Sequence, residues 1–461
     1  MTKVSPKFKR VVTSFFHRVR QVWRFKRFLR RSDFLNALRI ANQEQWSLDG
    51  DQRYCLFRLG CYISATHGAT DPKSARETVA LAVSFACQGE RDKHRKAVNV
   101  GLPYLRKNRR LLIECARGLA KYDPLFARSM LSNEKGAEDL VAALEFKIGN
   151  LDRANTTISS LTRPSNKSIL NGFHLIFANL EIDPLKKLFY LNHHLEALGL
   201  RKLILHNSEK QPMVLNVSSC EEFKKTTGPL VSIILPAYQA KRWIFHTISS
   251  LQNQQYENIE IIVVDDGSTD GTQKIVSQMA SLDNRIQYFR LDDNSGAYAA
   301  RNLGLDAANG AYITVNDADD YALPEKIEKQ VRPMIEDPYV VFTLSDLVRL
   351  DDDGVFGYRD VYPIQRINPS SLMFRRAEVF PKFGYWQNVR FGADSEYIAR
   401  LKSHYSTDRW QRIKLPLSLA ASHGQSLTTC GRTGNSEEGM NVKRMEYTES
   451  YVGKIVEISA Y

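Results

Sequence analysis

Strand-length apolar runs alternate with helical segments in the middle of the chain, and this alternation constrains the fold more than any other feature. The apolar runs are LVSIILPAY (230–238), IEIIVVDDG (259–267) and AYITVND (311–317). Apolar residues at helical spacing lie between them, in residues 244–253, 272–282 and 296–308. Continuous apolar strands that alternate with helices are typical of a sheet covered on both faces. The pattern therefore predicts a doubly wound, mostly parallel sheet of the α/β class.

Two of these strands end in aspartates. They are Asp265 and Asp266 after the second run, and Asp317, Asp319 and Asp320 after the third. Carboxylates this close raise each other's pKa values unless a cation or hydrogen-bond donors hold them. The third run also precedes LPE (323–325), which looks like a helix start, and aspartate before a helix caps it. Because ligands of such sheets bind outside the carboxyl ends of the strands, two acidic strand ends indicate a cation and a phosphorylated ligand.

The motifs of this region follow one another in a specific order. They are VSIILPAYQA, VVDDGSTDGT, NSGAYAARNLGLDAANGAYITVNDADD and, later, GADSEYIARL. In this order, over residues 230–429, the chain resembles the nucleotide-binding half of a GT-A glycosyltransferase of the family 2 type. The resemblance implies a Rossmann-like GT-A fold and an inverting, metal-dependent transfer from a UDP-sugar. The sequence has no GxxxxGK phosphate loop, and no GxGxxG follows the first strand as in a dinucleotide site.

The resemblance also implies a nucleoside site. Asp266 matches the family residue that accepts a hydrogen bond from the uracil N3–H, a role that suits an ionised carboxylate because it can only accept. Tyr238, two residues after Pro236, is placed to stack on the base, and a position at the edge of the core is the alternative. Arg301 resembles the family arginine near the nucleotide, and an exposed helical charge is its alternative.

The stretch Asp317-Ala318-Asp319 matches the DxD motif of the family. The resemblance implies that Asp317 binds the ribose and that Asp319 binds Mn²⁺ or Mg²⁺ bridging the diphosphate. Such ions take few protein ligands and complete their shell with phosphate oxygens, and here the ion would neutralise charge on the departing UDP. Asp320 is interpreted as a cap of the next helix. His423, in ASHGQSLTT, lies where the family often has a histidine at the metal or diphosphate; a structural histidine is the alternative.

Inversion requires one carboxylate to take the proton from the acceptor hydroxyl group. In the family, a Glu-Asp pair at a helix start supplies this base, and an arginine follows it. Here FGADSEYIAR offers Asp394, followed by Arg400 on the same expected helix, so Asp394 is the candidate base. Ala393 replaces the preceding acid of the family, Glu396 is a second candidate, and Asp394 as a helix N-cap is a further alternative.

The N-terminal segment carries most of the net charge. Residues 1–31 contain eleven basic residues and no acidic residue, which leaves +2 of the total +13 for the rest of the chain. Apolar side chains at helical spacing accompany these charges and are Phe15, Phe16, Val19, Val22 and Trp23. A basic amphipathic helix of this kind is typical of an anionic membrane surface. A helix packed on the next domain is the alternative, and nucleic acid is not expected because no recognition motif accompanies the charge.

Residues 32–225 show helical spacing of apolar residues throughout. The stretch 139–161 resembles part of a tetratricopeptide-like repeat, which predicts an all-α, repeat-like domain open to protein partners. His193 and His194 are adjacent on a helix and lack a carboxylate at ligand spacing, so they are interpreted as structural. The predicted division is therefore a basic amphipathic tail (1–31), a helical domain (32–225) and a glycosyltransferase domain (226–461).

Composition bounds the location of the protein. No stretch has the roughly 18 uncharged apolar residues that a membrane-spanning helix needs, and no secretory signal is visible. The six cysteines are scattered, and Cys55 and Cys61 are too far apart for a CxxC pair, so buried reduced thiols are expected. These features predict a cytoplasmic protein, peripheral on the inner face of the cell membrane.

The expected function is transfer of a sugar, hexosyl or N-acetylhexosaminyl, to a glycan or lipid-linked glycan acceptor in surface polysaccharide synthesis. One alternative is a non-catalytic module that binds sugar nucleotides or glycans, in which Ala393 marks the loss of activity. Another is a scaffold of a polysaccharide assembly complex, in which the helices of residues 32–225 bind partners.

Overall fold

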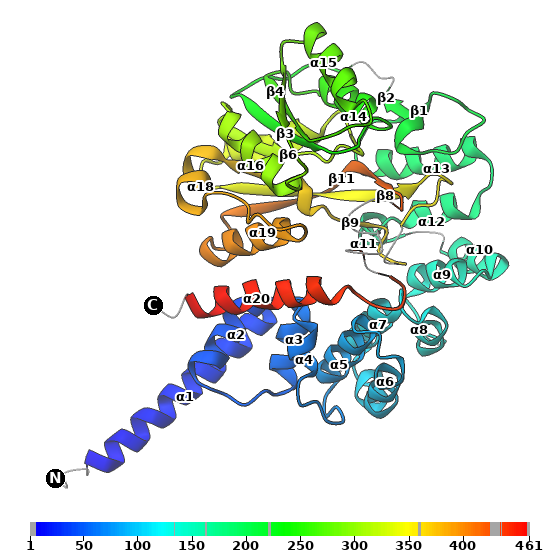
Figure 1. Cartoon of the computed structure of the whole chain (residues 1–461). Helices are drawn as coiled ribbons and strands as arrows, with labels where there is room; N and C mark the ends of the chain where they lie inside the picture. The colour runs from blue at the N-terminus through cyan, green and yellow to red at the C-terminus, as the bar shows by residue number, and fades with distance from the viewer. Residues whose placement is uncertain are drawn as a thin grey trace. The chain divides into compact units, whose positions relative to one another are not determined.

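The computed structural model of the chain describes residues 6–132, 134–161, 164–219, 223–357, 361–424, 434 and 436–458, with side chains from residue 17 to residue 457 of these ranges. The chain forms two compact units, one made of Met1–Tyr122 and Gly431–Tyr461 and the other of Asp123–Cys430. Each unit is described by itself (Figure 1).

The first unit is helical in its described residues. Short polar side chains cap several of its helices, since Asp33, Asp49, Ser74 and Asn108 each accept a backbone N–H group of the first turn. The helices are α1 (Pro6–Arg30), α2 (Phe34–Gln43), α3 (Gly50–Arg58), α4 (Tyr62–Thr66), α5 (Ala75–Cys87), α6 (Arg91–Arg106), α7 (Arg109–Leu119) and α20 (Val442–Ile458). Cys55, Cys61, Cys87 and Cys115 are buried free thiols, as expected for these four residues.

The C-terminal helix α20 returns to the N-terminal helices, and Figure 1 shows it along α2 and α4. The carboxylate of Glu449 accepts the backbone N–H groups of Ile63 and Ser64 at 2.7 and 3.0 Å. These N–H groups lie in the first turn of α4, where no intrahelical acceptor exists. A side chain from the far end of the chain therefore completes a helix of the N-terminal part.

Helix α1 confirms the helix expected near the N-terminus, but only its C-terminal part is buried. Phe25 and Leu29 are buried, and Phe25 packs edge-on against Trp46 at 5.5 Å between ring centroids. Val22 and Trp23 of the expected apolar stripe are 41% and 54% exposed. The last two turns therefore pack on the unit, while the stripe is uncovered; Phe15 and Phe16 lie outside the residues with described side chains.

The second unit begins with helices that precede the large sheet. They are α8 (Pro124–Met130), α9 (Glu138–Lys147), α10 (Leu151–Ser159), α11 (Asn166–Leu170), α12 (Phe173–Leu180) and α13 (Pro184–Ala197). A small antiparallel sheet of β1 (Leu203–Leu205) and β2 (Val217–Ser219), with a 3₁₀ turn η1 (Val214–Asn216), follows where the sequence predicted helix. The expectation of helix up to residue 225 is wrong here, because the Asn216 side-chain amide binds the carbonyl groups of Asn207, Lys210 and Gln211 and fixes the loop.

The large sheet contains nine of the described strands. Its first half has the order β5-β4-β3-β6 with all neighbours parallel, which confirms the predicted α/β class. The elements of this half are β3 (Val231–Ala237), α14 (Ile244–Gln252), β4 (Ile259–Asp266), α15 (Thr272–Leu282), β5 (Ile286–Leu291), α16 (Ala297–Ala307) and β6 (Tyr312–Val315).

The second half of the sheet is mixed rather than parallel, with the order β10-β8-β11-β7 and β9 paired to β8. Strand β10 is antiparallel to both neighbours, β11 is parallel to β8, and β7 is antiparallel to β11. The elements are β7 (Asp320–Ala322), α17 (Lys326–Glu336), β8 (Phe342–Asp351), β9 (Gln365–Ile367), η2 (Pro369–Ser371), β10 (Met373–Arg375), α18 (Arg376–Phe383), α19 (Ala393–His404) and β11 (Trp410–Ser422).

The two faces of the sheet bury alternate residues of the same strands. Ile233 of β3 lies in one core cluster with Val263, and Ile234 lies in the other with Ile262 and Val264. Burial of an aliphatic side chain of this size contributes about 1.5–3 kcal/mol. This explains why the strands read as continuous apolar runs: both faces are covered.

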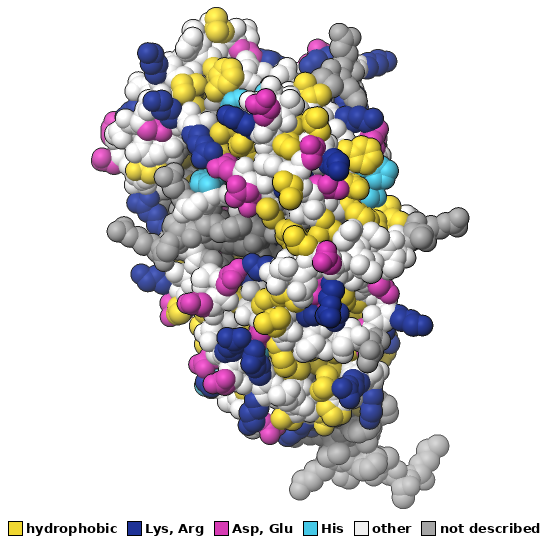
Figure 2. Space-filling view, turned by 90° about the vertical axis from the view of Figure 1, so that its right-hand side faces the viewer, with side chains coloured by type: hydrophobic (Ala, Val, Ile, Leu, Met, Phe, Trp, Pro, Cys, Tyr) yellow, Lys and Arg dark blue, Asp and Glu magenta, His cyan; other side chains and the backbone are white. Residues whose placement is uncertain are grey.

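The boundaries of the two compact units, after Tyr122 and after Cys430, differ from the predicted domain boundaries at residues 31 and 225. Residues 431–458 pack with the N-terminal helices, and α8–α13 pack with the sheet. On the face shown in Figure 2, basic and acidic side chains lie among hydrophobic ones. This mixture agrees with the small net charge outside the N-terminal segment.

Candidate active site

The acidic strand ends meet at one edge of the sheet. Strand β3 lies between β4 and β6, with Ala237 paired to Asp265 and Ile234 paired to Val315. The aspartates that end β4 and those that follow β6 therefore flank the end of β3 on its two sides. This arrangement is the one expected from the carboxyl-end rule for parallel strands.

Arg301 joins the DxD motif to the candidate base. Its guanidinium, on α16, lies 2.7 Å from a carboxylate oxygen of Asp317 and also pairs with Asp394. The side chain is 3% exposed, so the alternative of an exposed helical charge is wrong. Burial alone would lower the pKa of Arg301, but Asp394 and Asp317 raise it above its usual value. Burial would raise the pKa of Asp317, and Arg301 instead holds it below its usual value.

Asp394 lies in the first turn of α19, whose N-cap is Gly392. Its carboxylate accepts a hydrogen bond from the Tyr298 hydroxyl group at 2.8 Å, in addition to its pair with Arg301. The side chain thus faces the DxD motif rather than capping its own helix. Tyr298 was missed by sequence reasoning, although its position three residues before Arg301 places both on one face of α16.

Glu396, the second candidate for the base, lies in a different environment. It is 1% exposed, and its carboxylate pairs with Arg400 at 2.6 Å. Arg400 also donates to the carbonyl groups of Phe383 and Tyr385. These contacts give Glu396 and Arg400 a structural role in α19 and favour Asp394 as the base, which stays a prediction.

Asp319 and His423 form the second part of the site. The imidazole Nε2 of His423 lies 2.9 Å from a carboxylate oxygen of Asp319, and both side chains are partly exposed. Thr247 of α14 and Asn316 hold the turn that carries Asp319 through the carbonyl groups of Ala318 and Asp317. The residues after Gly424 in the ASHGQSLTT motif lie outside the described part of the chain.

These two side chains fit an incomplete site for a divalent cation. A carboxylate and an imidazole are accepted ligands of Mn²⁺, and they face each other at the strand ends. Among the described residues, no group of three or more His, Cys, Asp or Glu could hold a metal by itself. An ion at Asp319 and His423 would therefore depend on further oxygen ligands, such as those of a diphosphate.

Asp320 does not cap the following helix, contrary to the expectation. It belongs to strand β7, and the N-cap of α17 is Glu325, whose side chain makes no capping hydrogen bond. Burial, together with Asp319 and Asp317, raises the pKa of Asp320 well above its usual value. Lys326, buried beside it, binds the side-chain oxygen of Asn316, and burial lowers the pKa of Lys326 to about 8. Asp320 is therefore a buried group beneath the site.

Asp266 orders the loop that leads into α16. Its two carboxylate oxygens accept the backbone N–H groups of Ser295 and Gly296 at 2.7 and 2.8 Å. Gly296 has a φ of 102°, which favours glycine at this turn. A carboxylate has about four acceptor positions, so the predicted contact with a uracil N–H remains compatible with these bonds and stays a prediction.

The predicted stacking side chain is placed as expected for that role. Pro236 is buried within β3, and Tyr238 just beyond the strand is 49% exposed. Tyr238 is thus not part of the core, and its stacking on a base stays a prediction.

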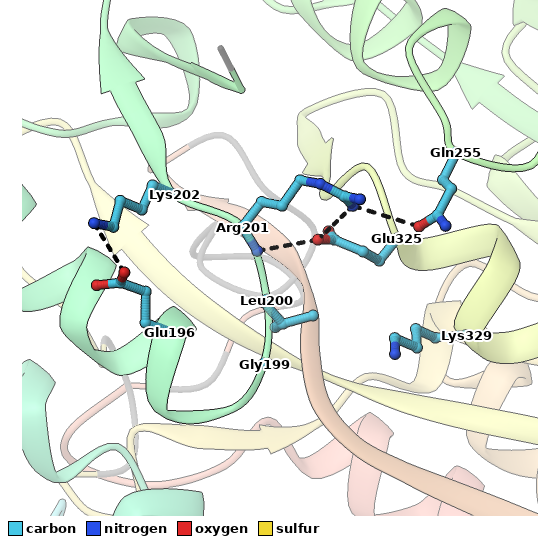
Figure 3. A pocket seen from close by; sticks show the side chains of 8 residues that line it. All are labelled: Glu196, Gly199, Leu200, Arg201, Lys202, Gln255, Glu325 and Lys329. Carbon is cyan, nitrogen blue, oxygen red and sulfur yellow. Dashed lines mark hydrogen bonds and ion pairs between the residues drawn. The ribbon is translucent and has the colours of Figure 1, made fainter. Parts of the chain in front are cut away.

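A hollow of about 340 Å³ lies at another place in the second unit, between the end of α13 and the start of α17 (Figure 3). Arg201 crosses it and donates to Glu325 through its backbone N–H and its guanidinium, both at 3.0 Å, and reaches Gln255 at 3.4 Å. Because Gln255 precedes β4, this hollow lies away from the strand ends that carry the aspartates. Its ion pair connects the helices α8–α13 to the large sheet.

A second hollow of about 500 Å³ opens beside His423. Its walls come from the loop after β3, the turn after β8 and the end of β11, and its lining residues are Gln239, Arg242, Trp243, Asp351, Asp352, Asp353, Ser422, His423 and Gly424. Arg242 and Asp352 form an ion pair across it at 2.7 Å.

The turn after β8 is held by the helices before the sheet. The buried ammonium of Lys187 donates to the carbonyl groups of Asp353 and Gly354 at 3.2 and 3.0 Å. The Asn179 amide donates to the carbonyl of Phe356 and accepts its N–H, at 2.8 and 2.7 Å. Helices α12 and α13 therefore shape one wall of the hollow beside His423.

The comparisons with known proteins agree with this geometry. Residues 232–386 match the family Glycosyl transferase family 2. An uncharacterised glycosyltransferase of Haemophilus influenzae is 41% identical over 126 residues, which are 27% of this chain and 50% of the relative. A putative teichuronic acid biosynthesis glycosyltransferase of Bacillus subtilis is 44% identical over 108 residues, 23% of this chain and 43% of the relative.

Among solved structures, that of S. aureus TarS 1-349 in complex with UDP-GlcNAc is similar to part of this chain. The similar parts make up 49% of this chain and 66% of the TarS chain, with 18% identity and a TM-score of 0.39. The matched stretches thus span half or less of the length of the two curated relatives. Residues 232–386 thus match glycosyl transferase family 2, and the chain is similar to glycosyltransferases over part of its length.

Proposed function

We propose that the chain transfers a sugar from a UDP-sugar to a hydroxyl group of a glycan or lipid-linked glycan, with inversion at the anomeric carbon. The observation that carries the proposal is the pairing of Arg301 with both Asp317 and Asp394. Through this pairing, a carboxylate proposed for the donor site and the candidate base both contact the guanidinium of Arg301. The guanidinium of Arg301 is buried, while both carboxylates remain partly exposed and can meet a substrate.

The chain's residues divide the work at this site. Tyr238 stacks on the base of the donor, Asp266 accepts from the uracil, and Asp317 accepts from the ribose. Asp394 takes the proton of the acceptor hydroxyl group as that oxygen attacks, and Tyr298 and Arg301 hold its carboxylate in place. A base within hydrogen-bond reach of the proton contributes about 10²–10⁴-fold to rate.

Asp319 and His423 would hold a divalent cation, Mn²⁺ or Mg²⁺, with the diphosphate of the donor supplying further oxygen ligands. When bound, the ion neutralises the negative charge of the leaving UDP. Arg301 pairs with Asp317 of the DxD motif and with Asp394, and so links the donor side of the site to the candidate base.

The glycan product is proposed to be a surface polysaccharide. The relative from Bacillus subtilis, 44% identical over 108 residues, carries the name of a putative teichuronic acid biosynthesis glycosyltransferase. Such synthesis uses UDP-sugars inside the cell and acceptors at the membrane, which suits a cytoplasmic protein that binds the inner membrane face. The exposed Val22 and Trp23 of α1, with the basic residues around them, support the membrane contact.

No helix among the described residues is long and apolar enough to cross a membrane. In the described part of the chain, we propose that contact with the membrane is made by α1, lying on the membrane surface. The helices α12 and α13 hold the turn beside the hollow at His423, so protein partners of the helical region would bind other faces of it.

Release of UDP from a panel of UDP-sugars with Mn²⁺ and a mixture of glycan acceptors tests the proposal. We expect Asp319→Ala and Asp394→Asn each to reduce release by at least about 100-fold, in line with loss of an acid–base or electrostatic group. Asp152→Asn, on the exposed start of α10, is the matched control and should leave release unchanged. Full release in both site variants would reject the assignment, and donor binding without turnover of any donor would favour a non-catalytic binding module.

A further inference from the structure

Trp243 lies against the candidate metal ligand. Its ring stacks on the imidazole of His423 with 5.1 Å between centroids and an interplanar angle of 23°. The Trp243 side chain is 6% exposed, so the contact is shielded from water. Arg242 places its guanidinium carbon 4.4 Å from the centroid of the Trp243 ring, which is a cation–π contact.

This stack is attached to the turn that α12 and α13 hold. Arg242 pairs with Asp352 at 2.7 Å, and the next residue, Asp353, accepts the Lys187 ammonium through its carbonyl group. An exposed ion pair contributes little to stability by itself. Here it also links the loop after β3 to the turn after β8, on both sides of the hollow beside His423.

The orientation of the His423 ring decides whether it binds a cation. An imidazole coordinates through a nitrogen lone pair that lies in the plane of the ring, so rotation of the ring moves the donor away. Hydrogen-bond partners of a ligating histidine fix this orientation, and their removal typically weakens metal binding 10–100-fold. A ring stacked on the imidazole restricts the same rotation. The stacked Trp243 restricts rotation of the ring while Nε2 faces Asp319.

We propose that Trp243 is a positioning residue of the cation site, which acts through His423. It keeps the imidazole plane directed to the point that the Asp319 carboxylate also faces. This inference rests on the proposed cation site at Asp319 and His423. It adds an aromatic residue that neither the DxD motif nor the C-terminal histidine identifies.

Binding of Mn²⁺ to the full-length protein in the presence of UDP tests the proposal, with the electron paramagnetic resonance signal of free Mn²⁺ as the readout. We expect Trp243→Leu to weaken Mn²⁺ binding about tenfold. Trp243→Phe keeps an aromatic face and should bind nearly as tightly as the wild type. Phe245→Leu, an exposed position on the same helix, is the matched control and should leave binding unchanged.

A double variant distinguishes two roles of Trp243, namely orientation of the His423 ring and general stabilisation of the fold. If Trp243 acts through His423, the double variant Trp243→Leu with His423→Ala binds Mn²⁺ no more weakly than His423→Ala alone. Thermal melting without metal identifies a variant that fails to fold, and Trp243→Met then replaces Trp243→Leu.

Two results would overturn the inference. Binding in Trp243→Leu equal to that of the wild type, with binding lost in His423→Ala, would leave the cation site standing and remove the role of Trp243. A further loss in the double variant would show that Trp243 acts by another route. Wild-type binding in both Asp319→Ala and His423→Ala would instead reject the cation site itself.

Discussion

The hydroxyl group of Tyr298 lies 2.8 Å from a carboxylate oxygen of Asp394, although the two residues come from α16 and α19. Tyr298 is 5% exposed, so water does not readily replace its hydroxyl group as the donor. This contact and the Arg301 pair fix the carboxylate that faces the DxD motif. The base, if Asp394 serves as one, is therefore oriented before an acceptor arrives.

Tyr298→Phe should lower kcat about tenfold with little change in the KM for the donor, because a hydrogen bond to a charged group contributes about 1.5 kcal/mol or more. Initial rates of UDP release measure both constants. Tyr104→Phe, at an exposed position in the first unit, serves as the control. A Tyr298→Phe enzyme with the kcat of the wild type would show that the contact does not orient the base.

Stability should fall at acidic pH because of two buried histidines on the helices α12 and α13. Burial lowers the pKa of His194 to about 3 and that of His174 to about 4, from an ordinary value of 6.5. Below pH 6.5 the unfolded chain takes up these protons while the folded chain does not. The free energy of unfolding therefore decreases by about 1.4 kcal/mol per pH unit for each histidine, until the pH reaches the folded pKa.

Urea unfolding at several pH values between 7 and 4.5 measures this dependence. His194→Gln cannot take up a proton and should show a shallower loss of stability than the wild type over this range. Gln365, which contacts the Nε2 atom of His194 at 3.1 Å, offers the replacement an amide partner. Equal pH dependence in the two proteins would assign the acid sensitivity to other groups.

A fragment of residues 226–461 should not fold stably, although the sequence suggests a domain boundary there. It lacks Lys187 and Asn179, which hold the turn after β8, and it separates α20 from α2 and α4. A fragment of residues 123–430 keeps the second compact unit whole and should melt cooperatively. Circular dichroism melting of both fragments checks the expectation, and equal cooperative transitions would contradict it.

The membrane contact predicts a specific effect of two exposed side chains. Val22→Glu with Trp23→Glu places negative charge on the uncovered stripe of α1 without removing Phe25 or Leu29, which are buried. The fraction of this double variant that sediments with anionic phosphatidylserine vesicles should be much smaller than that of the wild type. Binding of the wild type should weaken as the salt concentration rises. Leu282→Glu, a highly exposed position in the second unit, is the control. Unchanged vesicle binding in the double variant would exclude this stripe as the contact.

Much of the site follows from local patterns in the sequence. Continuous apolar runs, each followed by a helical pattern, locate the parallel strands because each periodicity reflects a backbone geometry. Aspartates directly after β4 and β6 then reach the same edge. Asp266, Asp317 and Asp319 could be found in this way, and the motif order adds the resemblance to a glycosyltransferase family.

Other features required the tertiary structure. The pair of Arg301 and Asp394 joins residues 93 positions apart, and no local pattern encodes such a contact. Asp320 occupies the short strand β7 because β11, far along the chain, supplies its partner. In the same way α20 closes the first unit, and Lys187 of α13 supports a turn of the active-site wall.

The sequence by itself determined the class of the fold, the strand ends that carry carboxylates and the resemblance of residues 230–429 to a glycosyltransferase family, because these depend on neighbouring residues along one chain segment. Only the tertiary structure decided which carboxylate faces the DxD motif, which tryptophan contacts His423 and which helices form one unit with the sheet. These outcomes depend on long-range packing, in which burial and charge pairing between distant segments outweigh local preference.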